Sequence, residues 1–350
     1  MDFGLTDEQE QLAQAERSWL ERHNPIERLR QSFDHTAATI DPAARRHAAE
    51  SGLLSLLTPD IGGTHVDLAI LSEAHGHAAS SLPIADLAIA VWLLDSADAP
   101  QAGPAGEGEL LLGVALGPEA AESSSGGLRL AGRTQPVPMA AETAGIVVVG
   151  QFHNGRGLGE AEYLAIVEGP ELSEMTTLDL TRSWARADLD VTVAADNWFA
   201  LPSGTVSRVR DARAVHRALD TLGAAARLLE MSVSYAGQRQ QFGVPIGSFQ
   251  AVKHHCSNMA IGVEAGRSAL WAAALALDTA VSSSARSRAA SSGVAYAKAA
   301  ASEVAGTALQ VHGGIGFTWE HDLHLLLRRI KVDEAMDGTV AEHRAALFTV

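Results

Sequence analysis

The stretch Arg239-Gln-Gln-Phe-Gly-Val-Pro-Ile-Gly-Ser-Phe-Gln250 separates two long segments of helical periodicity. Gly243, Pro245 and Gly247 disfavour a continuous helix, so one helix is expected to end before them and another to begin near Phe249-Gln250. An arginine on a rigid turn is suited to a phosphate group, since its planar guanidinium can make two charge-assisted hydrogen bonds. A solvated arginine on a surface loop explains the same residues, so this stretch alone leaves both interpretations open.

A second glycine-rich block, Gln310-Val-His-Gly-Gly-Ile-Gly-Phe317, follows another long helical pattern. Glycines let a backbone pass close to a ligand. They also commonly end a helix and begin a turn, which is the simpler interpretation. A dinucleotide-binding fingerprint does not fit the block, because no strand precedes it.

The third block, Asp337-Gly-Thr339, follows the basic run Arg328-Arg-Ile-Lys331. A carboxylate beside glycine could serve as a general base. It could equally be the amino-terminal cap of a helix over 340–347, and the residues alone favour the cap.

The rest of the chain divides by its periodicity. Thr6-Asp-Glu-Gln9 fits a capping box at the start of a first helix, and a second helix is expected over 43–57. Residues 99–108 have the composition of a linker, and short apolar runs separated by Gly, Pro and Ser follow, as in β structure. Long helical patterns return from about residue 207. The predicted domains are therefore a helical domain at 1–105, a β domain at 106–205 and a helical bundle at 206–350.

Composition limits the function. The net charge of −16 argues against nucleic acid as a partner, because phosphate neutralisation needs an excess of Lys and Arg. The single cysteine, Cys256, excludes an internal disulfide and is expected to be a small buried residue on a helix face. The histidines lack metal-ligand spacing, so no metal is predicted. No apolar run is long enough for a membrane span and no signal peptide is visible, so a soluble, cytoplasmic protein is expected.

Taken in order, the three blocks resemble the acyl-CoA dehydrogenase family. The opening Met1-Asp-Phe-x-Leu-Thr-x-Glu-Gln9 is similar to the first helix of that family, and Pro59-Asp-Ile-Gly-Gly63 is similar to its turn between early helices. The resemblance covers nearly the whole chain. It is most specific in 239–344 and least specific in 105–205.

The resemblance implies an α+β fold that is mainly α, with an amino-terminal helical domain, a small central β domain and a carboxy-terminal four-helix bundle, usually in tetramers. It implies that FAD is the cofactor, an acyl-CoA thioester the substrate and an electron-transfer flavoprotein the acceptor. Asp337 would be the base that removes the α proton, while the β hydrogen leaves as hydride to the flavin. The residues implied to contact FAD are Arg239, Phe242, Gln310 and Gly314, at the adenosine and pyrophosphate half of a neighbouring subunit's FAD, and Thr339, in its own subunit's site.

Two departures concern the base. The family usually has Glu before Gly-Thr, and Asp337 is one methylene shorter, although Asp serves at this place in some relatives, including the nitroalkane oxidases. Other relatives place a Glu at the start of the first bundle helix. The matching position here is Arg213, and the nearby Asp211 is off register.

A third departure concerns the central domain. The family's Thr-Glu-Pro-x-x-Gly-Ser-Asp signature is missing, and Leu116-Gly-Pro-Glu119 is at best a remnant. The Trp-Ile-Thr signature is also missing, near Arg133-Thr-Gln-Pro136. The resemblance therefore implies that contacts given to a neighbour's FAD are retained, while contacts to the chain's own flavin ring are lost.

This asymmetry is similar to one subunit of the actinobacterial α2β2 heterotetramers in the family that act on steroid side chains. Four hypotheses follow: such an accessory subunit, a self-sufficient homo-oligomer that uses Asp337, a flavin oxidase of the nitroalkane type, and a non-catalytic scaffold that completes a partner's FAD site.

Overall fold

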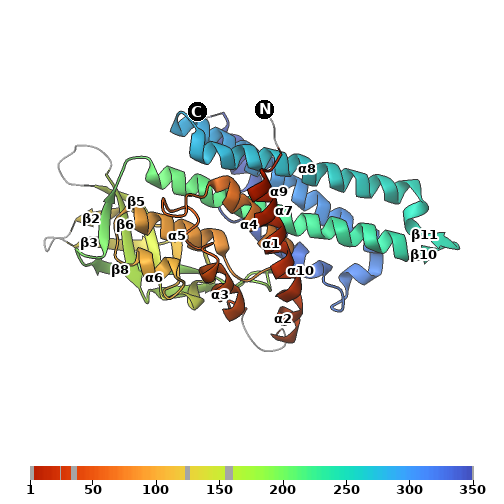
Figure 1. Cartoon of the computed structure of the whole chain (residues 1–350), viewed down its shortest axis with the longest axis horizontal. Coiled ribbons are helices and arrows are strands. Elements are labelled where there is room, and N and C mark those ends of the chain that lie inside the picture. The colour runs from red at the N-terminus through yellow and green to blue at the C-terminus, as the bar shows by residue number, and fades with distance from the viewer. Residues whose placement is uncertain (1–3, 24, 33–37, 123–126, 154–160, 349–350) are drawn as a thin grey trace.

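The computed structural model describes residues 4–23, 25–32, 38–122, 127–153 and 161–348. Helices come first, a sheet follows, and long helices end the chain (Figure 1). The predicted fold class, mainly helical with a small β region, is confirmed. Met1 to Phe3 of the opening motif lie outside the described residues.

The first helix, α1 (Asp7–His23), begins with the capping box that the sequence predicts. The Thr6 amide donates to Gln9 Oε1 at 3.1 Å, and the Gln9 amide donates to Thr6 Oγ1 at 3.2 Å. The helices that follow are α2 (Pro25–Ser32), α3 (Pro42–Glu50), α4 (His65–His77), α5 (Ile84–Ser96) and α6 (Ala102–Gly106).

Two predictions in this region were wrong. The helix expected over 43–57 ends at Glu50, because Gly52 takes the left-handed conformation with φ of 70°. The Leu53 amide then donates to the Ala48 carbonyl at 2.8 Å, which closes the helix end. The expected linker at 99–108 contains the short helix α6. Its Gly106 lies directly against Ser55, where a Cβ would overlap the hydroxyl.

One sheet of nine strands is formed within the described residues. Its central strand, β5 (Gly145–His153), pairs in parallel with β1 (Leu112–Leu116) and antiparallel with β6 (Ala161–Glu168). The other strands are β2 (Ala120–Glu122), β3 (Leu128–Arg133), β4 (Val137–Pro138), β7 (Glu171–Met175), β8 (Trp184–Val193) and β9 (Trp198–Leu201).

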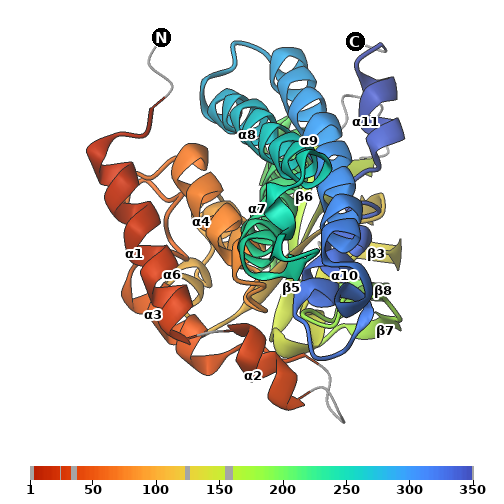
Figure 2. The same ribbon diagram turned by 90° about the vertical axis from the view of Figure 1, so that its right-hand side faces the viewer.

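The carboxy-terminal helices α7 (Thr205–Gln238), α8 (Gln250–Thr279), α9 (Ser283–His312) and α10 (Leu323–Asp333) form the bundle, and α11 (Val340–Ala346) packs on α9 (Figure 2). The break between α7 and α8 lies where the sequence predicts it. It holds a small hairpin of β10 (Gln240–Gln241) and β11 (Val244–Pro245), which forms the far tip of the bundle (Figure 1).

The helix α8 is long and apolar enough to cross a membrane by length and composition, but one such helix is weak evidence. It packs along α7 and α9, as a bundle helix does. Cys256 on α8 is only partly buried, which corrects the expectation of a buried thiol. One hydrophobic cluster includes residues of the early helices, the sheet and the bundle, so the domain boundaries remain predictions.

The helices α4 and α7 cross at close range at two glycines, Gly76 of α4 and Gly223 of α7. A Cβ on Gly223 would overlap the carbonyl oxygen of Glu73, and one on Gly76 would overlap that of Asp220. Since both neighbours are backbone atoms of packed helices, neither can move away locally.

We expect Gly223→Ala to lower the free energy of unfolding by ~3 kcal/mol or more, measured by urea denaturation. Gly237→Ala is the matched control, because that α7 glycine has open space around it. Equal midpoints for the two variants would contradict the close crossing.

Candidate functional site: a cavity beside a buried group of ion pairs

Asp337 lies in the loop between α10 and α11, and Lys298 hydrogen-bonds to the backbone of that loop. Lys298 of α9 is fully buried and donates to the carbonyl oxygens of Met336 at 2.6 Å and Gly338 at 2.7 Å. Burial lowers the pKa of Lys298 to about 8, although Asp337 and Asp333 act to raise it. These two hydrogen bonds fix the carbonyl groups of the residues before and after Asp337, whose φ is 52°.

The Asp337 carboxylate is paired with two arginines. Its oxygens lie 3.2 Å from Arg213 Nη2 and 3.3 Å from Arg217 Nε, and the side chain is only 5% exposed. Burial acts to raise the pKa of Asp337, but Arg213, Arg217 and Lys298 outweigh it and hold the pKa below its usual value. A carboxylate with a depressed pKa and two cationic partners is a weak proton acceptor.

The cap of α11 is Thr339 and not Asp337, contrary to the simpler interpretation of this block. Thr339 Oγ1 accepts from the Glu342 amide at 3.2 Å, and the Thr339 amide donates to Glu342 Oε2 at 2.7 Å. This capping box occupies the Thr339 hydroxyl in the described structure. A contact between Thr339 and a cofactor stays a prediction.

Arg213, at the position where some relatives carry their base, is buried between two carboxylates. Its Nε lies 3.5 Å from Asp86 Oδ1 of α5, and its Nη2 donates to the Pro136 carbonyl at 2.9 Å. Asp211, two residues earlier, is held by Arg286 at 2.8 Å and Ser287 at 2.7 Å. Neither residue places a free carboxylate beside Asp337.

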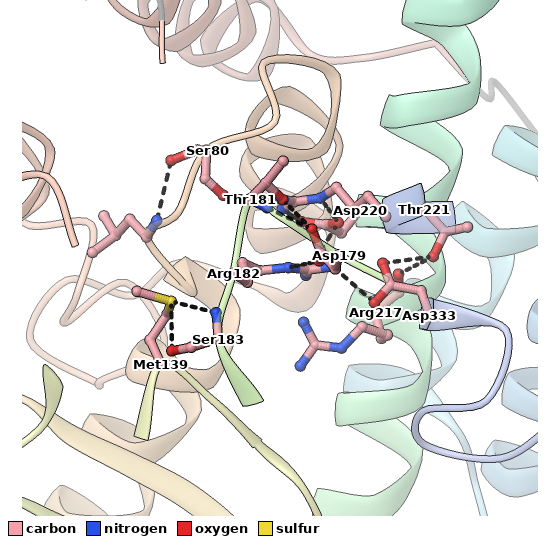
Figure 3. Close-up of polar contacts among 12 residues, drawn as sticks. Ser80, Met139, Asp179, Thr181, Arg182, Ser183, Arg217, Asp220, Thr221 and Asp333 are labelled. Carbon is pink, nitrogen blue, oxygen red and sulfur yellow. Dashed lines mark hydrogen bonds and ion pairs between the residues drawn. The ribbon is translucent and has the colours of Figure 1, made fainter. Parts of the chain in front are cut away.

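A buried group of ion pairs lies next to this loop and is called the arginine cluster below. It joins the segment before β8 to α7 and α10 (Figure 3). Arg182 donates to Asp179 at 3.0 Å and to Asp333 at 2.8 Å, and its side chain is 1% exposed. Arg329 donates twice to Asp220, at 2.8 and 2.6 Å. The remaining member is Arg217, whose guanidinium lies 4.9 Å from the ring centre of Trp184. The cluster therefore fixes α10, and with it the Asp337 loop, against the sheet and α7.

A cavity of about 680 Å³ lies between the sheet and the bundle, with Asp337 in its wall. Much of its lining is apolar and comes from Pro136, Met175, Ala214, Ala290 and Met336. A smaller cavity of about 240 Å³ lies beside it and shares Gln135, Arg186 and Arg210 with it. The smaller cavity is lined by Leu116, Gly117, Glu119, Arg133 and Thr134. These are residues of the two segments where the sequence departs from the flavin-ring signatures.

The residues implied to hold FAD lie elsewhere, around the tip of the bundle. Arg239 follows α7 directly and is exposed, and Phe242 in the hairpin is 92% exposed. Gln310 and Gly314, at the end of α9, are exposed as well. The two helix ends adjoin, since the rings of Tyr235 and His312 stack at 4.7 Å.

This tip is far from Asp337. Arg217, which contacts Asp337, lies in α7, and Arg239 directly follows the end of that helix. The two residues are about 22 positions apart, or ~33 Å along a helix. The structure therefore brings Arg239, Phe242, Gln310 and Gly314 to one end of the bundle and places Asp337 and Thr339 near the other. A single chain does not gather both sets into one pocket.

The residues suggest a fit to the outer half of FAD but not to its ring. Arg239 is exposed and has no ion pair in the part of the chain that the structure describes, and a Cβ on Gly314 would meet open space. The smaller cavity near Asp337 instead presents charged side chains in place of the family's flavin-ring contacts. Among the described residues, no group of three or more His, Cys, Asp or Glu could hold a metal ion.

A buried histidine pair between α4 and α7 makes stability depend on pH. His65 Nδ1 lies 3.0 Å from His216 Nε2, and His216 Nδ1 lies 3.1 Å from Ser72 Oγ. Burial, then Arg208, lowers the pKa of His65 to about 3, and burial lowers that of His216 as well. In the unfolded chain both histidines take up protons below pH ~6.5. In the folded chain His65 does so only near pH 3, and His216 only well below its usual range.

We therefore expect the free energy of unfolding to fall as pH drops from about 6.5 towards 3, by up to ~1.4 kcal/mol per pH unit for each histidine. Urea unfolding at stepped pH values measures the slope. His216→Gln should make the slope shallower, and His254→Gln, on the exposed side of α8, should not. An unchanged slope in His216→Gln would contradict the assignment.

Comparisons with known proteins agree with this architecture. Residues 207–347 match the family model for the acyl-CoA dehydrogenase C-terminal domain. Acyl-CoA dehydrogenase IpdE2 of Mycolicibacterium smegmatis is 28% identical over 305 residues, which is 83% of this chain and 89% of that protein. The segment 207–347 is thus similar to the C-terminal domain of the acyl-CoA dehydrogenases.

Two solved structures share the fold of this chain. One is the ChsE4-ChsE5 complex from Mycobacterium tuberculosis, with a TM-score of 0.87 and 23% identity over 99% of this chain and 97% of that one. The other is the Tcur3481-Tcur3483 steroid ACAD, with a TM-score of 0.85 and 23% identity over 97% and 96%. At this identity the likeness concerns the fold.

The sequence pointed to Asp337 but missed the residues that neutralise it. Arg213 and Arg217 are four apart on one helix, so they share a face, and this spacing is a signal that could have been read. Arg329 belongs to the basic run Arg328-Arg-Ile-Lys331 and is 1% exposed. Nothing local to that run distinguishes it from its neighbour Arg328.

Proposed function

We propose that this chain is the accessory subunit of an FAD-dependent acyl-CoA dehydrogenase that removes hydrogens from the α and β carbons of an acyl-CoA thioester. The observation that carries this proposal is the pairing of Asp337 with Arg213 and Arg217, because it leaves the expected base ionised, buried and engaged. The catalytic carboxylate would then belong to a partner subunit.

The tip of the bundle carries the residues that we propose contact the cofactor. Arg239 can pair with a phosphate of FAD bound in the neighbouring subunit, and the exposed ring of Phe242 can cover apolar surface next to it. Gly314 would allow the backbone to approach the cofactor. When bound, FAD accepts the hydride from the β carbon, and an electron-transfer flavoprotein is proposed to reoxidise it.

Related complexes suggest the assembly and the substrate. The similar folds include a complex of two differently named chains, ChsE4-ChsE5, and a two-component steroid ACAD. We propose a heteromer with another acyl-CoA dehydrogenase-like subunit, in the cytoplasm, acting on a steroid-derived or other lipid acyl-CoA. A homo-oligomer that uses Asp337, or an oxidase of the nitroalkane type, would need this carboxylate free of the two arginines.

The test uses Asp337→Asn in the chain alone and in the complex coexpressed with the product of a neighbouring gene. We expect the wild-type chain alone to be colourless and the complex to be yellow, with acyl-CoA turnover in the complex changed less than ~3-fold by the substitution. Loss of a general base would instead cost ~10²–10⁴-fold.

Because Asp337→Asn also leaves Arg213 and Arg217 short of a partner, turnover is normalised to bound flavin, and the melting temperature of the complex is recorded. A yellow chain that turns over acyl-CoA by itself, and loses that turnover in Asp337→Asn, would overturn the accessory assignment in favour of the self-sufficient one.

A further inference from the structure

Two arginines border both cavities and have no carboxylate partner among the described residues. Arg186 on β8 is half-buried, and its Nη1 donates to the Thr134 carbonyl at 3.1 Å. That hydrogen bond anchors the guanidinium at the cavity wall and leaves its other N–H groups available. Arg210 on α7 is exposed, and no hydrogen bond or ion pair joins its side chain to the described part of the chain.

The carboxylates of the larger cavity are already engaged by other groups. Asp211 accepts from Arg286 and Ser287, and Asp337 pairs with Arg213 and Arg217. Glu342 accepts from the backbone and hydroxyl of Thr339. None of these three acids neutralises Arg186 or Arg210.

The smaller cavity adds one further cation and one acid. Arg133 is paired with Asp188 across the strands β3 and β8. Glu119 also lines this cavity and would oppose an anion placed next to it. Since Asp188 neutralises Arg133, Arg186 and Arg210 face one glutamate, and the lining of the smaller cavity is still cationic.

The unpaired state of Arg210 is unusual for its surroundings. On the same helix, Arg213 and Arg217 both face Asp86 and Asp337, and Arg208 lies 4.0 Å from Asp278 and over the Trp92 ring. The chain carries 42 acidic residues against 26 basic ones. Acidic partners are therefore abundant in the chain, yet the side chains of Arg186 and Arg210 line the two cavities without one.

We infer that Arg186 and Arg210 together bind an anionic oxygen group, a phosphate or a carboxylate, of a ligand that enters these cavities. Each guanidinium offers planar paired donors that match such oxygens, and two cations in a partly enclosed space bind one anion more strongly than an exposed pair does. If the proposed function holds, the group is either a phosphate of the CoA part or a second carboxylate on the acyl part. The binding itself requires neither flavin nor turnover.

Calorimetric titration of the full chain, alone and in its complex, tests the site with three probes: CoA, glutarate and inorganic phosphate. We compare wild type with Arg186→Gln, Arg210→Gln and the double variant. The matched control is Arg129→Gln/Arg227→Gln, in which both arginines form exposed pairs, with Asp190 and Glu230. A hydrogen bond to a charged group typically contributes 1.5–3 kcal/mol, so each single substitution should weaken binding by about 10-fold and the double by about 100-fold.

The probes distinguish the sources of the anion. Binding of CoA that phosphate displaces and glutarate does not indicates a phosphate subsite, and binding of glutarate that displaces CoA indicates a carboxylate subsite. Raising the salt concentration from about 20 to 200 mM should weaken either one.

Affinities that are the same in wild type and in the double variant would overturn the inference, as would the absence of binding by all three probes at ~10 mM. Arg210 is exposed, so Arg210→Gln by itself decides the matter if the double variant unfolds. Flavin content measured on the same proteins shows separately whether the proposed function fails.

Discussion

Replacing Arg182 with methionine is expected to lower the free energy of unfolding by about 3–5 kcal/mol, the cost of removing one partner from buried ion pairs. Arg182 holds Asp179 and Asp333, whose side chains are fully buried, and also lies 3.4 Å from Asp220. Without the guanidinium, these carboxylates remain in a medium that solvates charge poorly. Urea unfolding of the purified variant measures the change.

Arg129→Met is the control for this experiment, because Arg129 pairs with the exposed Asp190 across neighbouring strands. Exposed pairs contribute roughly 0–1 kcal/mol, so its midpoint should hardly move. If Arg182→Met behaved like Arg129→Met, the arginine cluster would not hold α10 and the sheet together as described.

Replacing Arg239 with alanine is expected to weaken FAD binding by the assembled protein by about 10- to 100-fold. Charge-assisted hydrogen bonds contribute about 1.5–3 kcal/mol, and the alanine removes them without an internal replacement. Because Arg239 is exposed, the fold should be unaffected, and the melting temperature without added FAD should stay constant. The flavin-to-protein ratio at fixed FAD concentration is the measurement.

Gln241→Ala, two residues further along the same hairpin, controls for disturbance of the tip. Arg239→Ala with full flavin occupancy and Gln241→Ala with reduced occupancy would together show that the hairpin, and not the charge, contacts the cofactor.

These two residues also illustrate how the chain divides its roles. Arg182 works inside the molecule, where it fixes the Asp337 loop, and Arg239 presents its charge at a tip that lies ~33 Å from that loop along α7. A chain that engages its own carboxylate and exposes its proposed cofactor contacts is suited to complete another subunit's site.

The local sequence determined the features that depend on a few neighbouring residues. The capping box at Thr6 and the break between α7 and α8 were predicted correctly, because capping hydroxyls, glycine and proline act within one turn. The helix over 43–57 was predicted too long, because periodicity does not show that Gly52 takes a left-handed conformation. The order of helices, then strands, then helices was also predicted correctly, since a hydrophobic period of two residues differs from one of 3.6 residues over short windows.

Only the tertiary structure decided what Asp337 can do. Its partner Arg217 is 120 residues away in the sequence, and Asp86, which shares that arginine, is 131 residues from it. The sequence placed a carboxylate in the third block and an arginine at 213, but charge type alone does not show which side chains face one another. Burial then determines the outcome: in a poorly solvating interior an acid must be paired, and the fold supplies that pairing from α7 at the position where a base was expected.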